Sequence, residues 1–241
     1  MTGPLRPVRN SILNALPPED FARLAPHLSH IALEKGRLLY DPGDLIETVY
    51  FPNNCVISLM TLMDNGAAIE SATVGREGAL GLGTAIAPRQ SLSRTIIQVA
   101  GDASRMPSGP LKEAYGRSAA LRTLIDRHSD ALYGHAIQSV ACNALHSVEA
   151  RFCRWLLTCH DRIDENTVGL TQEFLADMLG VQRTTVTAVA GALQAKGLIR
   201  YRRGIVDILD RAGLQAMTCE CYGAVRRLYE RLLPDTANAR K

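Results

Sequence analysis

Residues 170–208 read LTQEFLADMLGVQRTTVTAVAGALQAKGLIRYRRGIVDI, and this stretch decides the fold of the C-terminal half. The hydroxyl of Thr171 can cap a helix by accepting a backbone N–H. Gly180 can end that helix, because glycine adopts the left-handed conformation of a helix stop. A second helix is expected from about residue 182 to 195. Apolar residues recur in both helices at spacings of three and four, which places them on one face. Two helices joined by a short turn at a glycine are typical of a helix-turn-helix.

The spacing inside this segment supports the same interpretation. If Gln172 is counted as position one, Ala176 is fifth, Gly180 ninth and Val186 fifteenth. These are the positions where the two helices touch, where the turn needs glycine, and where the second helix enters the core. A generic helical hairpin satisfies some of these positions but rarely all of them.

The outward face of the second helix carries small, polar and basic side chains that can enter a major groove. An arginine can bond guanine with two hydrogen bonds, glutamine can read adenine, and a threonine or alanine methyl can contact thymine. We therefore predict that bases are contacted by Gln182, Arg183, Thr184, Thr187 and Ala188.

A one-sided run of charge accompanies the motif. Residues 178–206 contain five basic side chains and no acidic one, which is the pattern that a phosphate backbone attracts. Residues 198–201 and 205–209 predict two short strands around Arg203-Gly204, which would form a wing. A charge run is more often only a solvated surface, but its position beside the motif favours DNA. The predicted phosphate contacts are Thr171, Lys196, Arg200, Arg202 and Arg203.

On these motifs, the chain resembles the Crp/Fnr family of bacterial transcription regulators over nearly its whole length. Residues 170–199 align without gaps to the family's helix-turn-helix. In its cyclic-AMP-dependent members the recognition helix presents arginine, glutamate and a second arginine. Arg183 matches the first arginine, whereas Thr184 replaces the glutamate and Ala188 the second arginine, so we expect a different operator sequence.

The N-terminal half contains many short β-rich runs separated by turns. Asp64-Asn65-Gly66 lies between two such runs and predicts a hairpin, and a short helical segment at residues 17–28 precedes them. This pattern is typical of an antiparallel roll or barrel. The resemblance implies the same fold, a β-roll similar to cyclic-nucleotide-binding domains.

The expected effector site departs from the family's best-known pattern. Cyclic-nucleotide binders carry a glutamate for the ribose and an Arg-Ser/Thr pair for the cyclic phosphate. Here no acidic residue lies between Gly78 and Gly101, so we do not expect cyclic AMP. Ser93, Arg94 and Thr95 can still form an anion pocket for an unidentified small molecule; the alternative is a surface arginine at a strand start.

A long helix is expected over residues 118–147. Residues on one side of it alternate spacings of four and three, which is the period of a two-stranded coiled coil, and in the family this helix forms the homodimer. The predicted dimer seam comprises Leu121, Ile125, His128, Leu132, His135, Ser139 and Cys142. Histidine and cysteine on the seam allow a metal, haem or pH sensor, whereas the simpler interpretation is that polar residues fix the register.

Other features limit the remaining classes of function. The sequence has no signal peptide, no apolar run long enough to span a membrane, and no phosphate-loop, nucleophile-elbow or metalloprotease motif. We therefore expect a cytoplasmic protein that is not an enzyme. The six cysteines lack the spacing of a disulfide framework. The family's oxygen sensors bind an iron–sulfur cluster with cysteines near the N-terminus, whereas here no cysteine precedes Cys55. Cys219 and Cys221 on one helix would diverge by about 200° and form a poor metal clamp, so no cofactor or metal is assigned.

The sequence thus predicts an α+β protein with a β-roll sensor (residues 1–117), a dimerisation helix (118–147) and a winged helix-turn-helix (148–241). The net charge of +3 lies entirely in residues 147–241. The expected function is a homodimeric transcription regulator that binds a pseudo-palindromic operator in duplex DNA and, if it activates, RNA polymerase. The alternative is a regulator that needs no ligand, or one that responds to redox state or metal through the seam.

Overall fold

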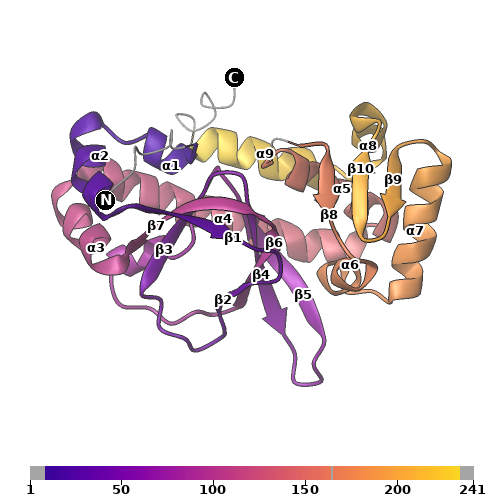
Figure 1. The fold of residues 1–241 in the computed structure, drawn as a ribbon, viewed down its shortest axis with the longest axis horizontal. Helices are drawn as coiled ribbons and strands as arrows, with labels where there is room; N and C mark the ends of the chain where they lie inside the picture. Colours follow the sequence, from indigo (N-terminus) through magenta and orange to yellow (C-terminus); the bar gives the residue numbers. More distant parts are fainter. Residues whose placement is uncertain (1–8, 164, 234–241) are drawn as a thin grey trace.

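The computed structural model describes residues 9–163 and 165–233 of the chain. Figure 1 shows a β-roll at one end, a winged helix-turn-helix at the other, and helix α4 running between them. The predicted α+β class is confirmed. Within the described residues, no helix has both the length and the apolar character needed to cross a membrane.

The roll consists of two antiparallel sheets. Apolar residues that alternate along the strands point between the sheets, where Tyr40, Ile57 and Ile97 are buried. Gly66 has a φ of +83° in the turn between β4 and β5, as the Asp-Asn-Gly sequence predicts. One sheet has the order β1 (Ser29–Leu33), β7 (Gly101–Pro107), β3 (Thr48–Pro52); the other has β2 (Leu38–Tyr40), β6 (Arg94–Val99), β4 (Val56–Leu62), β5 (Ala68–Val74).

Short helices flank the roll and lead into the long one. The Ser118 hydroxyl accepts a hydrogen bond from the backbone N–H of Leu121 (2.9 Å) and so caps α4 (Ala119–Leu145). With 27 residues, α4 is about 40 Å long. The other helical segments of this half are α1 (Ser11–Asn14), α2 (Pro18–Leu24), η1 (Ala25–His27), η2 (Leu82–Ala85) and α3 (Ser108–Arg117).

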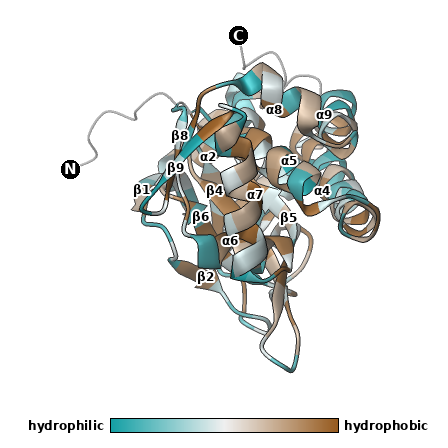
Figure 2. Ribbon diagram, turned by 90° about the vertical axis from the view of Figure 1, so that its right-hand side faces the viewer, coloured by the Kyte–Doolittle hydropathy of each residue, from teal (hydrophilic) through white to brown (hydrophobic). Residues whose placement is uncertain are grey.

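The C-terminal half has a core of its own that is continuous with the roll. Phe152, Trp155 and Leu156 of α5 are buried together with Val56 and Met60 of β4. In Figure 2, helices α6 and α7 lie in front of strands β4, β5 and β6, and α6 contacts β5. The elements are α5 (Val148–His160), β8 (Thr167–Gly169), α6 (Gln172–Leu179), α7 (Arg183–Ala195), β9 (Ile199–Arg202), β10 (Ile205–Ile208), α8 (Arg211–Met217) and α9 (Cys221–Leu232).

The structure differs from the sequence-based prediction in several elements. Contrary to the expectation from the sequence, Cys219 and Cys221 do not lie on one helix, because the chain turns at residues 218–220 and so forms two helices, α8 and α9. Helix α9 then runs back along α4 toward α1 (Figure 1). Strands β1, β7 and β8 and helices α1 and α3 were not predicted, since their sequences lack a clear apolar period. The division into three domains stays a prediction.

Candidate DNA-binding surface

Helix α7 presents its polar side chains to solvent. Val186, Ala190 and Leu193 are buried in the core and fix which side of α7 faces inward. The five side chains predicted to contact bases are all exposed at the N-terminal end of this helix, where Gln182 is the N-cap residue: Gln182, Arg183, Thr184, Thr187 and Ala188. Their base contacts stay a prediction, but the helix leaves them accessible.

Helix α6 and the turn after it hold α7 in place. The Thr171 hydroxyl accepts a hydrogen bond from the backbone N–H of Phe174 (3.2 Å), as expected for a helix cap. Gly180 ends α6 with a φ of +61°. A Cβ atom at Gly180 would lie 2.9 Å from the terminal methyl group of Ile69 in β5, so that side chain would have to shift.

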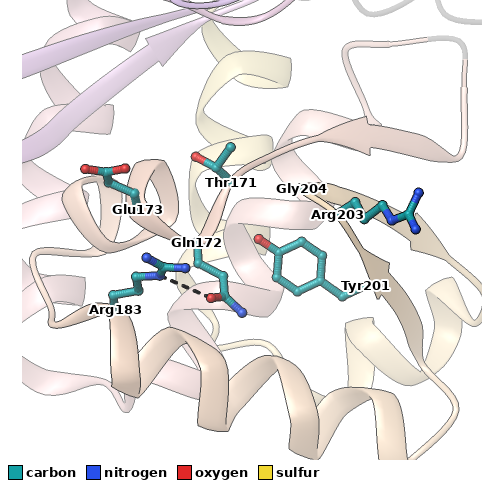
Figure 3. A pocket seen from close by; sticks show the side chains of 7 residues that line it. All are labelled: Thr171, Gln172, Glu173, Arg183, Tyr201, Arg203 and Gly204. Atoms are coloured by element: carbon teal, nitrogen blue, oxygen red, sulfur yellow. Dashed lines mark hydrogen bonds between the residues drawn. The ribbon is translucent and has the colours of Figure 1, made fainter.

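A hollow of about 450 Å³ lies between the first turns of α6 and α7 and the wing. Figure 3 shows Gln172 and Arg183 pointing toward each other across it. Arg183 Nε donates a hydrogen bond to Gln172 Oε1 (3.3 Å), which holds the guanidinium beside α6. Gln172 was not predicted as a site residue, although it occupies the first helical position after the Thr171 cap. The hollow is lined by Thr171, Gln172, Glu173, Arg183, Tyr201, Arg203 and Gly204.

Tyr201 joins the wing to the start of α6. Its hydroxyl donates a hydrogen bond to the carbonyl oxygen of Leu170 (2.9 Å), and the Leu170 N–H donates to the carbonyl oxygen of Gly204 (2.5 Å). Burial raises the pKa of the Tyr201 hydroxyl, and the Arg183 guanidinium opposes this shift. At the wing tip Arg203 and Gly204 have φ values of +48° and +78°, as a tight hairpin turn requires. The wing and α6 therefore form one rigid frame.

The predicted phosphate contacts do not all lie on the hollow. Arg203 lines it, and the Thr171 hydroxyl is engaged as the helix cap. Arg200 and Arg202 are exposed and, because side chains alternate along β9, lie on the face opposite Tyr201. Lys196 follows the last turn of α7, about 20 Å from Arg183, and its ammonium group is 3.0 Å from the Glu149 carboxylate. Lys196 is thus the least suited of the five for DNA.

Known proteins share both this motif and its surroundings. Residues 150–217 match the model of the Crp-like helix-turn-helix domain. This part of the chain is therefore similar to Crp-like helix-turn-helix domains. No curated protein sequence matches the chain significantly.

Several solved structures have a similar overall fold, and two of them are of Crp/Fnr-family transcriptional regulators. FixK2 from Bradyrhizobium japonicum superposes with a TM-score of 0.67 at 15% identity over 80% of this chain and 98% of its own. A CRP/FNR-family transcriptional regulator from Thermus thermophilus gives 0.62 at 20% identity over 78% and 97%. A crp/fnr-family regulator from Eubacterium rectale gives 0.60 at 19% identity over 86% and 96%. The resemblance to Crp/Fnr transcription regulators is confirmed in the domain and in the fold.

The predicted effector residues lie at the open end of strand β6. Arg94 Nε is 2.6 Å from the carboxylate of Asp41, so its charge is already paired. Thr95 is buried, and its hydroxyl donates to the carbonyl oxygen of Tyr40 (3.4 Å). Successive residues of a strand point to opposite faces, so Arg94 and Thr95 do not converge on one ligand. The anion pocket at Ser93, Arg94 and Thr95 stays a prediction that this geometry does not favour.

The predicted dimer seam faces the interior of the protomer. The backbone N–H of Ala79 donates to His128 Nε2 (3.3 Å), and the His135 ring packs edge-on against Tyr229 of α9 (6.2 Å between centroids). Side chains buried against the roll and α9 are not accessible to a second protomer, so this geometry does not favour their assignment to a seam, which stays a prediction. Six of the seven are buried and Leu132 is half-buried: Leu121, Ile125, His128, Leu132, His135, Ser139 and Cys142.

The opposite face of α4 carries exposed apolar side chains. Tyr133, Ile137 and Val140 are 70%, 53% and 71% exposed, and Ala144 continues the row. Their spacings are four, three and four residues, the same heptad period as on the buried face. Periodicity alone could not tell the two faces apart, because one helix can pack on its own roll and on another helix at once. We call residues 133, 137, 140 and 144 the outer stripe.

Proposed function

We propose that this protein is a sequence-specific DNA-binding transcription regulator that acts as a homodimer under the control of an effector. The observation that carries the proposal is the exposed polar end of α7 beside the wing hollow, within a Crp-like helix-turn-helix domain. The members of the predicted base-contacting set are exposed and lie on one helix end. An α-helix presented in this way fits a major groove.

Arg183 is the proposed principal reader. Its guanidinium is held by Gln172 at 3.3 Å, a bond weak enough to exchange for two hydrogen bonds to the O6 and N7 atoms of guanine. The Thr184 and Ala188 side chains offer methyl groups for thymine. Arg203 at the wing tip is placed to contact phosphate on the adjacent backbone, which positions the domain without reading sequence.

The outer stripe of α4 supports dimerisation with a second copy of this chain. A heptad row of exposed apolar residues on a long helix matches a two-stranded coiled coil, in which each copy covers the other. Two copies related by a two-fold axis would present two α7 helices to half-sites one helical turn apart. The expected operator is therefore pseudo-palindromic, and an activator of this kind would also contact RNA polymerase.

Effector control would act through the contact between the roll and the winged helix-turn-helix. The Gln98 side-chain amide of β6 donates to the sulfur of Met178 in α6 (2.6 Å) and to the carboxylate of Glu70 (2.8 Å). Burial raises the pKa of the Glu70 carboxyl. A ligand that binds one conformation of the roll more tightly would favour that conformation. Through this contact it would also change the position of the winged helix-turn-helix.

The proposed function is tested by selecting bound duplexes from random DNA with purified protein and no added ligand. A two-fold symmetric motif with half-site centres about one helical turn apart supports a dimeric reader that is competent without effector. If no motif emerges, the selection is repeated after a thermal-shift screen of small molecules has identified a stabilising ligand. The proposal is rejected if that ligand-bound protein also enriches no sequence.

A further inference from the structure

Four side chains at the junction of α4, α8 and α9 converge on one point. Cys142 and His146 lie at the C-terminal end of α4, Cys219 in the turn between α8 and α9, and Cys221 at the first position of α9. The Sγ atoms of Cys142 and Cys219 are 3.5 Å apart, and Cys221 Sγ is 3.5 Å from His146 Nδ1. All four ligand atoms lie within 4.8 Å of one another.

The break between α8 and α9 makes this convergence possible. On one continuous helix the thiols of Cys219 and Cys221 would point about 200° apart, which is why the sequence argued against a metal clamp. In the structure Cys219 lies before α9 begins, so its side chain turns toward the same point as that of Cys221. The expectation of a poor clamp is therefore wrong.

The set matches the coordination chemistry of zinc. Three cysteines and one histidine are a common tetrahedral ligand set of structural zinc sites. Zn–S and Zn–N bonds of about 2.3 and 2.0–2.1 Å require ligand atoms about 3.5–3.8 Å apart. The Cys142–Cys219 and Cys221–His146 separations of 3.5 Å meet this requirement. The cluster is far too compact for a multinuclear iron–sulfur cluster, whose ligands must surround several metal atoms.

Groups around the four ligands orient them as in a metal site. His146 turns Nδ1 toward the thiols, while its Nε2 is 3.1 Å from the Glu220 carboxylate. A carboxylate on the other ring nitrogen is the usual partner of a metal-bound histidine. The Gln138 amide donates to Cys221 Sγ (3.0 Å), as expected for a thiolate acceptor.

We propose that Cys142, His146, Cys219 and Cys221 bind one zinc ion in a closed tetrahedral site. Binding displaces three thiol protons and leaves the histidine neutral, so the site carries a net charge of −1. The buried Arg151 lies close enough to interact with Cys142 and offsets this charge. Its Nε has no hydrogen-bond partner among the described residues, while its Nη1 donates to the carbonyl oxygen of Leu179 (3.0 Å), next to the Gly180 turn. The zinc would thus tie the end of α4 to α9 and, through Arg151, to the helix-turn-helix.

A redox switch is a weaker account of the same residues. Reactive cysteines are usually partly exposed, whereas Cys142 and Cys219 are both buried. A disulfide between Cys142 and Cys219 would also leave His146, Cys221 and the His146–Glu220 contact without a role.

The test is metal uptake by the full chain, prepared reduced and stripped by a chelator. One zinc per chain is expected by inductively coupled plasma mass spectrometry, with a dissociation constant below about 50 nM, the weak end of the affinities of structural zinc sites. Cobalt(II) is expected to give the intense visible bands of a tetrahedral site and thiolate-to-cobalt charge-transfer absorption. Zinc should displace the cobalt and remove both signals.

Variants locate the metal independently of DNA binding. Cys219→Ala and Cys221→Ala should each lower zinc affinity at least 100-fold, and His146→Ala should lower it and shift the cobalt bands. Cys153→Ala is the matched control, because Cys153 is a buried cysteine of the same half outside the cluster, and it should retain the metal. The cobalt spectrum of the unmodified chain decides the matter if a variant does not fold. The proposal fails if the reduced chain takes up no metal, if uptake survives both Cys219→Ala and Cys221→Ala, or if the cobalt spectrum lacks thiolate charge transfer.

Discussion

Arg162 Nη2, just after helix α5, lies 2.6 Å from Glu77 Oε1 of the roll, and both side chains are 6% exposed. Arg162 also bonds to Thr73 of β5, while Glu77 accepts the backbone N–H of Gly75 (3.1 Å). This buried pair therefore joins the end of α5 to the turn after β5. It fixes the placement of the helix-turn-helix half on the roll.

Breaking this pair should destabilise the protein strongly. Glu77→Gln removes the carboxylate that pairs directly with the buried Arg162 guanidinium, so the free energy of unfolding should fall by about 3–5 kcal/mol. Urea denaturation followed by circular dichroism measures this. The control is Glu230→Gln, which removes the exposed pair with Arg226 (3.1 Å) and should cost at most about 0.5 kcal/mol. Equal effects of the two substitutions would contradict the assigned role of the buried pair.

Arg183→Ala should reduce discrimination between the selected operator and random DNA by about 1–3 kcal/mol, because Arg183 is the residue proposed to make a bidentate contact with a base. Arg202→Ala should instead weaken binding to both duplexes about equally and reduce the salt slope by about one. Fluorescence anisotropy over a range of salt concentrations separates the two effects. An equal loss of affinity for every sequence in Arg183→Ala would show that Arg183 does not read bases.

The outer stripe should govern self-association. Val140→Asp places a carboxylate at an apolar seam in both copies, so dimerisation should weaken by roughly 100-fold or more. Analytical ultracentrifugation measures the dissociation constant. Leu92→Asp changes a leucine that is 96% exposed in the roll and should leave dimerisation unchanged. A dimer that survives Val140→Asp would place the interface elsewhere.

The wing tip should tolerate little change in backbone conformation. Gly204→Ala puts a Cβ atom on a residue with φ of +78°, 3.4 Å from Thr171 Cγ2, and should cost about 1–2 kcal/mol of stability. Binding to all duplexes should weaken, because Gly204 holds Leu170 and the wing. At Gly116 in α3 an added Cβ atom would meet no neighbouring group within 4 Å. Gly116→Ala should therefore stabilise the protein slightly and leave DNA binding unchanged. Thermal unfolding and anisotropy provide both measurements.

Stability should fall in mild acid. Burial lowers the pKa of the His128 imidazole from 6.5 to about 4, and the Glu77 carboxylate partly opposes this. Burial also lowers the pKa of His135, as do the charges of Arg162 and Arg154. Because the unfolded chain binds these protons at higher pH than the native chain, the free energy of unfolding decreases as pH falls from about 6.5 toward 4. The His128 contribution is about 3 kcal/mol.

Urea denaturation at several pH values measures the slope of the free energy of unfolding against pH. His128→Gln should flatten it, although the substitution lowers stability at neutral pH. The exposed His27→Gln is the control and should leave the slope unchanged. A slope that persists undiminished in His128→Gln would assign the acid sensitivity to other groups.

Local sequence determined the helix-turn-helix almost completely. The cap at Thr171, the left-handed Gly180 and the apolar stripe of α7 depend only on neighbouring residues, so the pattern specifies them without knowledge of the rest of the chain. The same holds for the β4–β5 hairpin of the roll, where Asp64-Asn65-Gly66 sets the conformation of the turn. The Crp-like domain could therefore be expected from the order of its residues alone.

Only the tertiary structure decided which surfaces meet. The period of α4 fits both of its faces, and packing of His128 and His135 against the roll and α9 is what leaves the outer stripe exposed. Likewise, the break before α9 brings Cys219 and Cys221 to Cys142, which precedes them by more than 70 residues. The spacing of apolar residues predicts which of them share one face of a helix or strand. Contacts between distant elements depend instead on the direction in which the chain leaves each turn. The physical reason is that the residues of a turn set only the local backbone conformation. Which distant element packs against a helix or strand depends on the fold of the whole chain.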